Sequence, residues 1–369
     1  MSANELQTEQ SGTAAPLRVA VVGAGAFGRN HVRVYAELQR IGAGVELCAV
    51  VDRDPEVVAA ARAQYGVDGY TTVEELLAAC ATKGVRLDAV SVCVPTVHHA
   101  AVAEALLPEG IDLLIEKPLA ATLEETDRIV ALAAEHGRVV QAGHLERFNP
   151  AVIAARRFLN RPMFFEAHRL SIFTPRSLDV DVVLDLMIHD LDIVLSLVDA
   201  PVREVRAVGL PVLSGKVDIA NVRVEFENGC VANFTASRVS TERVRKLRFF
   251  QPRQYLSLDF ARQDLLVIDA PDVGALAGMD PAQLAAMVAA AQAGQSGNDH
   301  PSAGLSLRKA EVEPGEPLRL EISSFLDAVR RRAVPVVSAA DGRRALSLAL
   351  AINAAIADHA RRARLTISN

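Results

Sequence analysis

Two chemically active side chains stand four residues apart in an otherwise apolar stretch. Asp185 and His189 occur in residues 182–198, whose sequence is VVLDLMIHDLDIVLSLV. In an α-helix, residues i and i+4 share a face, so the carboxylate and the imidazole would be neighbours, with Asp192 and Ser196 continuing that face. Unpaired buried polar groups are costly. The stripe therefore predicts either a satisfied hydrogen bond in the core or a histidine that acts as a general base.

Two more clusters of reactive side chains follow short apolar runs. They are residues 94–99, VPTVHH, and residues 116–118, EKP. Ligands of parallel sheets bind beyond the carboxyl ends of the strands. No cysteine or carboxylate is spaced to complete a metal site with the two histidines, so we predict a nicotinamide neighbour and no metal. Lys117 can hold a nicotinamide ribose and a substrate hydroxyl, the alternative being a solvated Glu-Lys surface pair.

A glycine-rich turn follows the first apolar run. Residues 19–22 lead into GAGAFG at residues 23–28. A helix that starts at such a turn offers N–H donors and a partial positive charge to a pyrophosphate, although a structural turn without a nucleotide is the alternative. The second apolar run ends at Asp52, whose carboxylate can accept from a ribose 2′-hydroxyl and favours NAD over NADP. The adjacent Arg53 is the one cation there that could accommodate a 2′-phosphate.

The composition is that of an ordinary globular protein. The chain has 369 residues, 50% of them hydrophobic and 23% charged, with a formal net charge of −6. This length predicts two domains, and the negative charge argues against nucleic acid or an anionic membrane as the main partner. No run approaches the roughly 20 apolar residues of a membrane helix. Four scattered cysteines without zinc spacing indicate reduced thiols and a cytoplasmic protein.

The first part of the chain alternates apolar runs with Ala-rich amphipathic stretches. This alternation over residues 17–143 predicts a parallel sheet with helical crossovers, the Rossmann arrangement once the glycine turn is included. Residues 1–16 lack signal-peptide features and are expected to form a disordered tail.

The pattern changes after Gly143. A helix over 150–159 precedes a strand, the Asp185/His189 helix and a series of alternating strand-like runs, with a hairpin signal at Asn228-Gly229. We expect residues 144–340 to form an α/β domain with an open, mostly antiparallel sheet, and residues 341–369 to form a last helix. Residues 273–306, rich in Ala, Gly, Gln and Ser, are expected to be an insertion or mobile loop.

Taken together, these segments resemble the glucose–fructose oxidoreductase, inositol dehydrogenase and MocA family. The resemblance is carried by GAGAFG, Asp52, VPTVHHA, EKP, GHLERFNP and the DxxxH pair, and it covers the chain from Leu17 onward. It implies a Rossmann domain, a second domain whose open sheet face forms a homodimer or homotetramer contact, and a last helix that packs back on the Rossmann domain.

The resemblance also implies roles for individual residues. His189 would take a hydroxyl proton while a hydride passes to NAD, Lys117 would bridge substrate and cofactor, and Asp185 would hold a neighbouring hydroxyl and help to orient the imidazole. The cofactor-binding residues are then expected to be Gly23, Gly25, Ala26, Phe27, Gly28, Asp52, Arg53, Pro95, Thr96, His99, Glu116 and Lys117.

Longer segments narrow the resemblance, among them GHLERFNPAV, VDIANVRVEF, CVANFTASRVS and RVRKLRFFQP. They resemble a subgroup of the family that oxidises UDP-N-acetylglucosamine at C3, before an aminotransferase makes a 3-amino sugar for amide-linked lipid A. A UDP-sugar needs cations for its diphosphate. The cationic candidates in the second domain are Arg147, Arg169, Arg176, Arg238, Arg243, Arg245, Lys246 and Arg248, of which we expect two or three to reach the ligand. The expected substrate-binding residues are Lys117, Arg147, Asn149, His168, Arg169, Asp185 and His189.

Four other functions stay open from the sequence. They are the oxidation of a free sugar or inositol, the oxidation of a UDP-uronic acid, a glycosidase that oxidises and re-reduces its sugar on bound NAD, and a non-catalytic NAD-binding sensor. The sensor would not need Lys117, Asp185 and His189, and all three are present.

Overall fold

The fold was analysed in a computed structural model of the chain, which describes residues 15–173, 180–270, 280–282, 285 and 306–367. The expected tail up to residue 14, Arg176 and nearly all of the expected insertion 273–306 lie outside the described residues.

The first domain contains a six-stranded parallel sheet in the order β3-β2-β1-β4-β5-β6. Its strands are β1 (Leu17–Val22), β2 (Val45–Val51), β3 (Asp68–Tyr70), β4 (Ala89–Val92), β5 (Asp112–Glu116) and β6 (Val140–Gly143). Its helices are α1 (Gly28–Arg40), α2 (Pro55–Tyr65), α3 (Val73–Lys83), the short η1 (Thr96–His98), α4 (His99–Leu106) and α5 (Leu123–Glu135). This strand order is that of dinucleotide-binding Rossmann folds and confirms the predicted fold class. The short strand β3 was not anticipated from the sequence.

The second domain contains an eight-stranded sheet in the order β14-β13-β12-β11-β7-β10-β9-β8, in which only β7 and β10 run parallel. Its strands are β7 (Phe164–Ile172), β8 (Val202–Leu210), β9 (Ile219–Phe226), β10 (Val231–Ser240), β11 (Val244–Gln251), β12 (Gln254–Asp259), β13 (Asp264–Asp269) and β14 (Ser306–Lys309). The Asn228-Gly229 hairpin joins β9 to β10 as predicted, with Gly229 at φ 82°. The predicted, mostly antiparallel sheet is thus confirmed.

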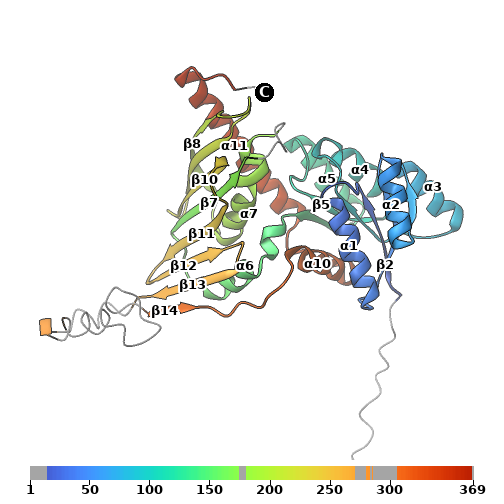
Figure 1. Cartoon of the computed structure of the whole chain (residues 1–369), viewed down its shortest axis with the longest axis horizontal. Helices are drawn as coiled ribbons and strands as arrows, with labels where there is room; N and C mark the ends of the chain where they lie inside the picture. The colour runs from blue at the N-terminus through green and yellow to red at the C-terminus, as the bar shows by residue number, and fades with distance from the viewer. Residues whose placement is uncertain (1–14, 174–179, 271–279, 283–284, 286–305, 368–369) are drawn as a thin grey trace, which may run out of the picture.

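Helices cover one face of the second sheet and lie between it and the first domain (Figure 1). They are η2 (Leu145–Phe148), α6 (Pro150–Ala155), η3 (Arg156–Phe158), η4 (Val183–Met187), α7 (Ile188–Leu197) and the long α11 (Ala339–Ala363). The core beneath them is formed by alternate strand residues such as Phe165, Phe234 and Phe249. The other face of the sheet carries partly exposed polar and aromatic side chains, including Glu166 and Arg248.

The helix α10 (Pro317–Arg331) packs on the first domain, although the expected boundaries, 144–340, assigned it to the second. Its apolar side chains Leu318, Ile322 and Phe325 join the core that α1 forms with β1 and β2. The sequence shows that α10 is amphipathic. It does not show that the apolar face of α10 packs on α1, because this contact joins segments about 280 residues apart and no local pattern encodes it. The last helix, α11, contacts both β8 and α7 of the second domain and α5 and β6 of the first.

Local signals explain where several helices start. Thr122 and Glu125 form a capping box at α5, and Ser338 and Asp341 form one at α11. Asp54 accepts from the Glu56 N–H at the start of α2. Within the described residues, no helix combines the length and the apolar composition that a membrane span requires.

A buried carboxyl on α10 generates a prediction about stability. Glu321 is fully buried, and neither of its carboxyl oxygens has a hydrogen-bond partner among the described residues. Burial, with smaller contributions from Glu116 and Asp192, raises its pKa well above the usual range. In the unfolded chain, the carboxyl of Glu321 loses its proton at about pH 4.3. The stability that the neutral acid contributes is therefore full below that pH and is lost as the pH rises toward the folded pKa.

We expect Glu321→Gln to stabilise the protein by roughly 1–3 kcal/mol at pH 8 and by much less at pH 5, because the amide stays neutral. Urea unfolding at the two pH values measures this difference. Glu135→Gln, a change at an exposed carboxyl of α5, is the control. An equal gain at both pH values would show that ionisation of Glu321 does not limit stability.

Candidate active site

A cavity of about 660 Å³ lies at the carboxyl ends of β1, β2 and β4. Of the expected cofactor-binding residues, five line it: Gly23, Gly25, Asp52, Arg53 and Pro95. Such an opening at the point where the strand order reverses is where open α/β sheets bind nucleotides. The cavity does not extend to Lys117, Asp185 or His189. The cavity therefore lies where the adenosine and pyrophosphate half of a dinucleotide would bind in such a fold.

The glycine turn lets two backbone segments approach closely. Gly23 has φ 87°, and a Cβ there would lie 2.7 Å from the main chain of Cys93 and Val94. A Cβ on Gly28 would lie 1.8 Å from the Gly23 carbonyl oxygen. The helix α1 then starts without a side-chain cap. The Arg29 N–H already donates to the Gly25 carbonyl oxygen at 3.2 Å and the Asn30 N–H to that of Phe27 at 2.8 Å, so an anion such as a pyrophosphate would bind the N–H groups of the turn that precedes them.

Asp52 is held at the edge of this cavity by two main-chain groups. Its Oδ2 accepts from the Ala24 N–H at 2.8 Å, and its Oδ1 accepts from the Asp54 N–H at 3.0 Å. Each carboxylate oxygen keeps further acceptor capacity. The arrangement fits a pair of ribose hydroxyls. Ala26 and Phe27 are exposed at the turn beside it.

His99, which was expected to bind the cofactor, does not line the cavity, whereas its neighbour His98 does. His99 is buried, with Nδ1 3.0 Å from the Pro118 carbonyl oxygen and Nε2 2.9 Å from that of Val94. It therefore ties the EKP segment to the end of β4, while the exposed His98 lines the cavity. The reason is that His98 ends the short η1 helix, whereas His99 begins α4 and turns inward. Thr96 lies in η1, next to the cavity-lining Pro95.

Residues 71–74, which join β3 to α3, also line the cavity and were not anticipated. The three-residue β3 leaves too short an apolar run to mark this strand end in the sequence.

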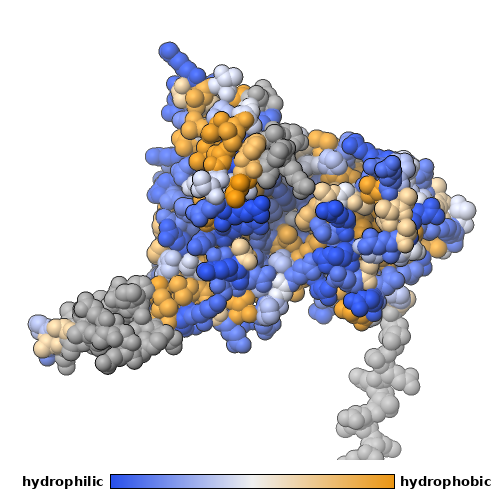
Figure 2. All heavy atoms as spheres, viewed as in Figure 1, coloured by the Kyte–Doolittle hydropathy of each residue, from blue (hydrophilic) through white to orange (hydrophobic). Residues whose placement is uncertain are grey.

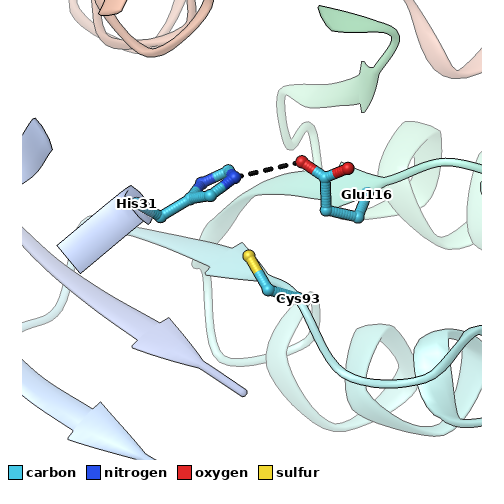
Figure 3. Close-up of side chains that lie close together, drawn as sticks. All are labelled: His31, Cys93 and Glu116. Atoms are coloured by element: carbon cyan, nitrogen blue, oxygen red, sulfur yellow. Dashed lines mark hydrogen bonds and ion pairs between the residues drawn. The ribbon is translucent and has the colours of Figure 1, made fainter. Parts of the chain in front are cut away.

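Glu116, the first residue of EKP, is fixed by a buried histidine. His31 Nε2 lies 3.0 Å from Glu116 Oε1, with the Cys93 thiol beside them (Figure 3). These three side chains form a set that could hold a metal ion by ligand type and spacing. Burial raises the pKa of the Cys93 thiol well above its usual range, so it is not a thiolate ligand as it stands. We interpret the His31–Glu116 pair as a support for the end of β5.

Lys117 reaches from the first domain to the catalytic segment of the second. Its Nζ donates to the main-chain carbonyl of Asp185 at 2.7 Å. Asp185 lies in η4, a single π-helical turn that precedes α7, and not in the regular α-helix that the i, i+4 spacing predicts. Such turns are frequent at functional sites. Burial lowers the pKa of Lys117, while the charges of Asp185 and Glu116 act in the opposite sense.

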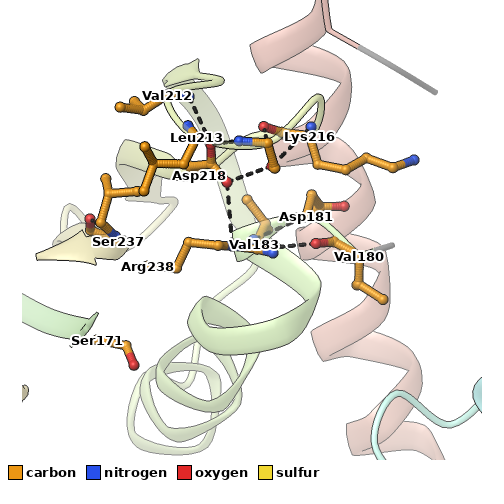
Figure 4. A network of polar contacts seen from close by, with 12 residues as sticks. Ser171, Val180, Asp181, Val183, Val212, Leu213, Lys216, Asp218, Ser237 and Arg238 are labelled. Atoms are coloured by element: carbon orange, nitrogen blue, oxygen red, sulfur yellow. Dashed lines mark hydrogen bonds and ion pairs between the residues drawn. The ribbon is translucent and has the colours of Figure 1, made fainter. Parts of the chain in front are cut away.

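The start of the π turn is held by a polar network (Figure 4). Asp181 Oδ1 accepts from the N–H groups of Val183 and Leu184, and Arg238 donates to the Val180 carbonyl oxygen at 2.5 Å. Arg238 is itself 3.7 Å from Asp218. This buried arginine is therefore part of the scaffold of the catalytic segment.

His189 lies at the first turn of α7 with its Nδ1 buried and unpartnered among the described residues. Asp185 therefore does not orient the ring through that nitrogen, and its charge acts on Lys117 instead. The predicted orienting role of Asp185 thus has no contact to support it, because the π turn changes the angular spacing of residues 185 and 189. The predicted proximity of Lys117 to this segment is observed.

Two of the expected substrate-binding arginines are committed to buried ion pairs. Arg147 in η2 donates two hydrogen bonds of 2.7 Å to Asp192, and its side chain is 5% exposed. Arg169 in β7 donates to Asp190 at 2.8 and 2.9 Å and to Glu146 at 2.9 Å. These ion pairs attach α7, just after His189, to β7 and η2. They argue against direct contact with a diphosphate, since they leave these two guanidinium groups buried and already paired.

Of the remaining two expected substrate-binding residues, one is committed to hydrogen bonds within the protein and the other lies on the open face of the sheet. Asn149 is buried and caps α6 by accepting from the Ala151 N–H. His168 precedes Arg169 in β7, and successive strand residues point to opposite faces. His168 therefore lies on the open face of the sheet, away from α7, although the sequence suggested that both flank the cleft.

Comparisons with known proteins agree with this geometry. Residues 17–144 match a family model described as an oxidoreductase family with an NAD-binding Rossmann fold, GFO_IDH_MocA, and residues 140–252 match the GFO/IDH/MocA C-terminal domain. The UDP-N-acetylglucosamine 3-dehydrogenase of Acidithiobacillus ferrooxidans is 35% identical over 341 residues, which cover 92% of this chain and 97% of that protein.

A solved structure of that Acidithiobacillus ferrooxidans enzyme superimposes with a TM-score of 0.78, over 93% of this chain and 98% of its own, at 33% identity. The inositol 2-dehydrogenase of Burkholderia cenocepacia is 33% identical over 186 residues, which cover 48% of this chain and 53% of that protein. The similarity to the first enzyme thus extends over both domains.

The surroundings of His189 predict the pH dependence of activity. Burial, followed by the charges of Lys117 and Arg169 and by His144 and Arg245, lowers its pKa well below the usual value of about 6.5. Lys117 and His144 directly follow β5 and β6, and Arg169 and Arg245 lie in β7 and β11. The carboxylates nearby are paired, Asp190 and Glu146 with Arg169, and the charge of Asp185 acts on Lys117. A general base must be neutral.

We therefore expect kcat/KM to stay near its maximum down to about pH 6 and to fall only below that. Initial rates with saturating cofactor between pH 5 and 9 measure this profile, and His189→Asn, which should be inactive, is the control. An acid limb with its midpoint above pH 6.5 would contradict a base in this environment.

Proposed function

The chain belongs to the GFO/IDH/MocA family of NAD-dependent oxidoreductases, and from this premise we propose that it oxidises the C3 hydroxyl of UDP-N-acetylglucosamine to a ketone. The observation that supports this choice of substrate is the 35% identity with a UDP-N-acetylglucosamine 3-dehydrogenase along 92% of the chain. The match to the inositol 2-dehydrogenase covers only 48% of the chain, so it supports a shared type of reaction more than a shared substrate.

The cofactor is NAD, and the first domain has the features that fit it. The turn at Gly23 to Gly28 and the uncapped start of α1 would hold the pyrophosphate, and Asp52 would hold the adenosine ribose. The acidic Asp52 favours NAD over NADP because it repels a 2′-phosphate. Bound NAD supplies the hydride acceptor for the reaction.

The side chains between the domains would carry the proton chemistry. In our proposal, His189 takes the proton from the C3 hydroxyl as the C3 hydrogen leaves as a hydride. The ammonium group of Lys117 offsets the negative charge that develops on the C3 oxygen. Asp185, whose charge acts on Lys117, would accept from a neighbouring sugar hydroxyl. The neutral state of His189 is maintained by its burial and its cationic neighbours.

The product of this reaction is a keto sugar, which an aminotransferase can convert to a 3-amino sugar of the kind found in amide-linked lipid A. We propose such an aminotransferase as the functional partner. The four cysteines, all free thiols, fit a cytoplasmic location for this chemistry.

We also propose that the open face of the second sheet forms a homodimer contact. Phe164, Phe250 and Tyr255 stack there with ring centroids 4.8–5.6 Å apart. Apolar side chains also gather near β8 and β10 (Figure 2), where Val208 and Leu210 are exposed. Exposed apolar surface of this kind is typical of protein interfaces.

The substrate assignment is tested by supplying UDP-N-acetylglucosamine and NAD together with an aminotransferase and an amino donor. We expect NADH and a UDP-linked 3-amino sugar, identified by mass spectrometry. Free N-acetylglucosamine, myo-inositol and a UDP-uronic acid are the comparison substrates. Faster turnover of any of these three, with NAD binding intact, would reject C3 oxidation of UDP-N-acetylglucosamine.

The role of Lys117 predicts the kinetics of its variants. Lys117→Met keeps most of the side-chain volume but removes the charge, so we expect kcat to fall by about 10²-fold or more, with a smaller change in KM. Lys246→Met, at an exposed lysine of β11, is the control. A change confined to KM would indicate that Lys117 only binds the substrate.

A further inference from the structure

One arginine of the second sheet, Arg245, differs from the others in the face of the sheet on which it lies and in its exposure to solvent. In the antiparallel pairing of β7 with β11, Arg245 lies opposite Arg169, so the two side chains share the face that carries α7. Lys246 and Arg248 pair with His168 and Glu166 on the opposite, open face. Arg245 is thus on the catalytic side of the sheet.

Arg245 is exposed to solvent, whereas Arg169, its partner in the strand pairing, is buried. Its side chain is 52% exposed, and its one ion pair among the described residues is a 4.0 Å approach of Nη1 to Glu146 Oε1. That oxygen already accepts from Arg169 at 2.9 Å. A guanidinium has five N–H donors. Arg245 therefore presents a charge and several unused donors to solvent at the edge of the buried ion-pair network.

The other cations near the site are already committed. Arg147 and Arg169 are buried in their carboxylate pairs, and Arg238 is buried against Val180 and Asp218. Lys117 donates to the Asp185 carbonyl. Arg245 is therefore the exposed cation whose side chain faces α7 from the paired β7–β11 strands.

Arg245 is also close enough to the catalytic base to act on it. Its charge is one of the influences that lower the pKa of His189. In a UDP-sugar the diphosphate is attached at C1, only one sugar ring away from C3. When C3 lies at His189, the diphosphate must consequently lie close by, where a guanidinium fork can bind two phosphate oxygens.

We propose that Arg245 is the diphosphate-binding residue and that it selects nucleotide sugars over free sugars. This inference rests on the proposed function for the identity of the sugar. The buried Glu146–Arg169–Asp190 network would form its base, since Glu146 holds the Arg245 guanidinium near the cleft without neutralising it fully.

The test compares Arg245→Met with the wild type at saturating NAD, using UDP, uridine and methyl N-acetylglucosaminide as competing ligands. We expect the inhibition constant of UDP and the KM of UDP-N-acetylglucosamine to rise about 10- to 100-fold, the loss expected for charge-assisted hydrogen bonds. Uridine and the methyl glycoside lack the diphosphate, so their binding should not change. Arg245→Lys should recover part of the loss, because it restores a charge but not the fork.

Arg128→Met is the matched control, because Arg128 is similarly exposed and has one ion pair, with Glu104, on the first domain. An Arg245→Met variant that binds UDP as tightly as the wild type overturns the proposal, and so does a wild type that does not bind UDP. A third outcome separates the two proposals. If UDP binding depends on Arg245 but the wild type does not oxidise UDP-N-acetylglucosamine, the diphosphate site is supported and the proposed function is rejected.

Discussion

The candidate site depends on two buried ion pairs, each of an arginine with an aspartate, that attach α7, the helix of the proposed base His189, to the rest of the protein. Arg169 binds Asp190 from β7, and Arg147 binds Asp192 from η2. Both aspartates follow His189 closely on α7. A buried charge that loses its partner costs about 3–5 kcal/mol, so each ion pair constrains the rotation of α7 strongly. The position of the base relative to Lys117 follows from this constraint.

The same constraint sets the electrostatics of the site. Burial, followed by the charges of Lys117 and Arg169, lowers the pKa of His189 and so favours the neutral ring that the proposed base requires. Burial also lowers the pKa of Lys117, whose ammonium spans from β5 to the π turn. The scaffold and the proposed chemistry therefore share residues, since Arg169 joins β7 to α7 and Lys117 joins the two domains.

The arginines of the second domain consequently divide into two classes. Buried arginines such as Arg147, Arg169 and Arg238 organise the backbone and the catalytic helix. An exposed arginine on the same sheet face, Arg245, remains for a ligand. Charge and sequence position alone do not separate these classes, since all four occur in similar polar or alternating segments. Burial and the strand register separate them.

The sequence by itself determined the features that depend on neighbouring residues. The period of the apolar runs, the GAGAFG turn, Asp52 and the Asn228-Gly229 hairpin specified the Rossmann fold, the cofactor and the open sheet, since strand alternation and turn geometry are local. Only the tertiary structure decided the packing of α10 on α1, the burial of His99 with His98 at the cavity, the face of β7 that carries α7, and the π turn at Asp185. Each of these depends on a contact between residues distant in the chain, such as His99 with Pro118 or Lys117 with Asp185, and the energy of such a contact is set by burial that no local pattern reports.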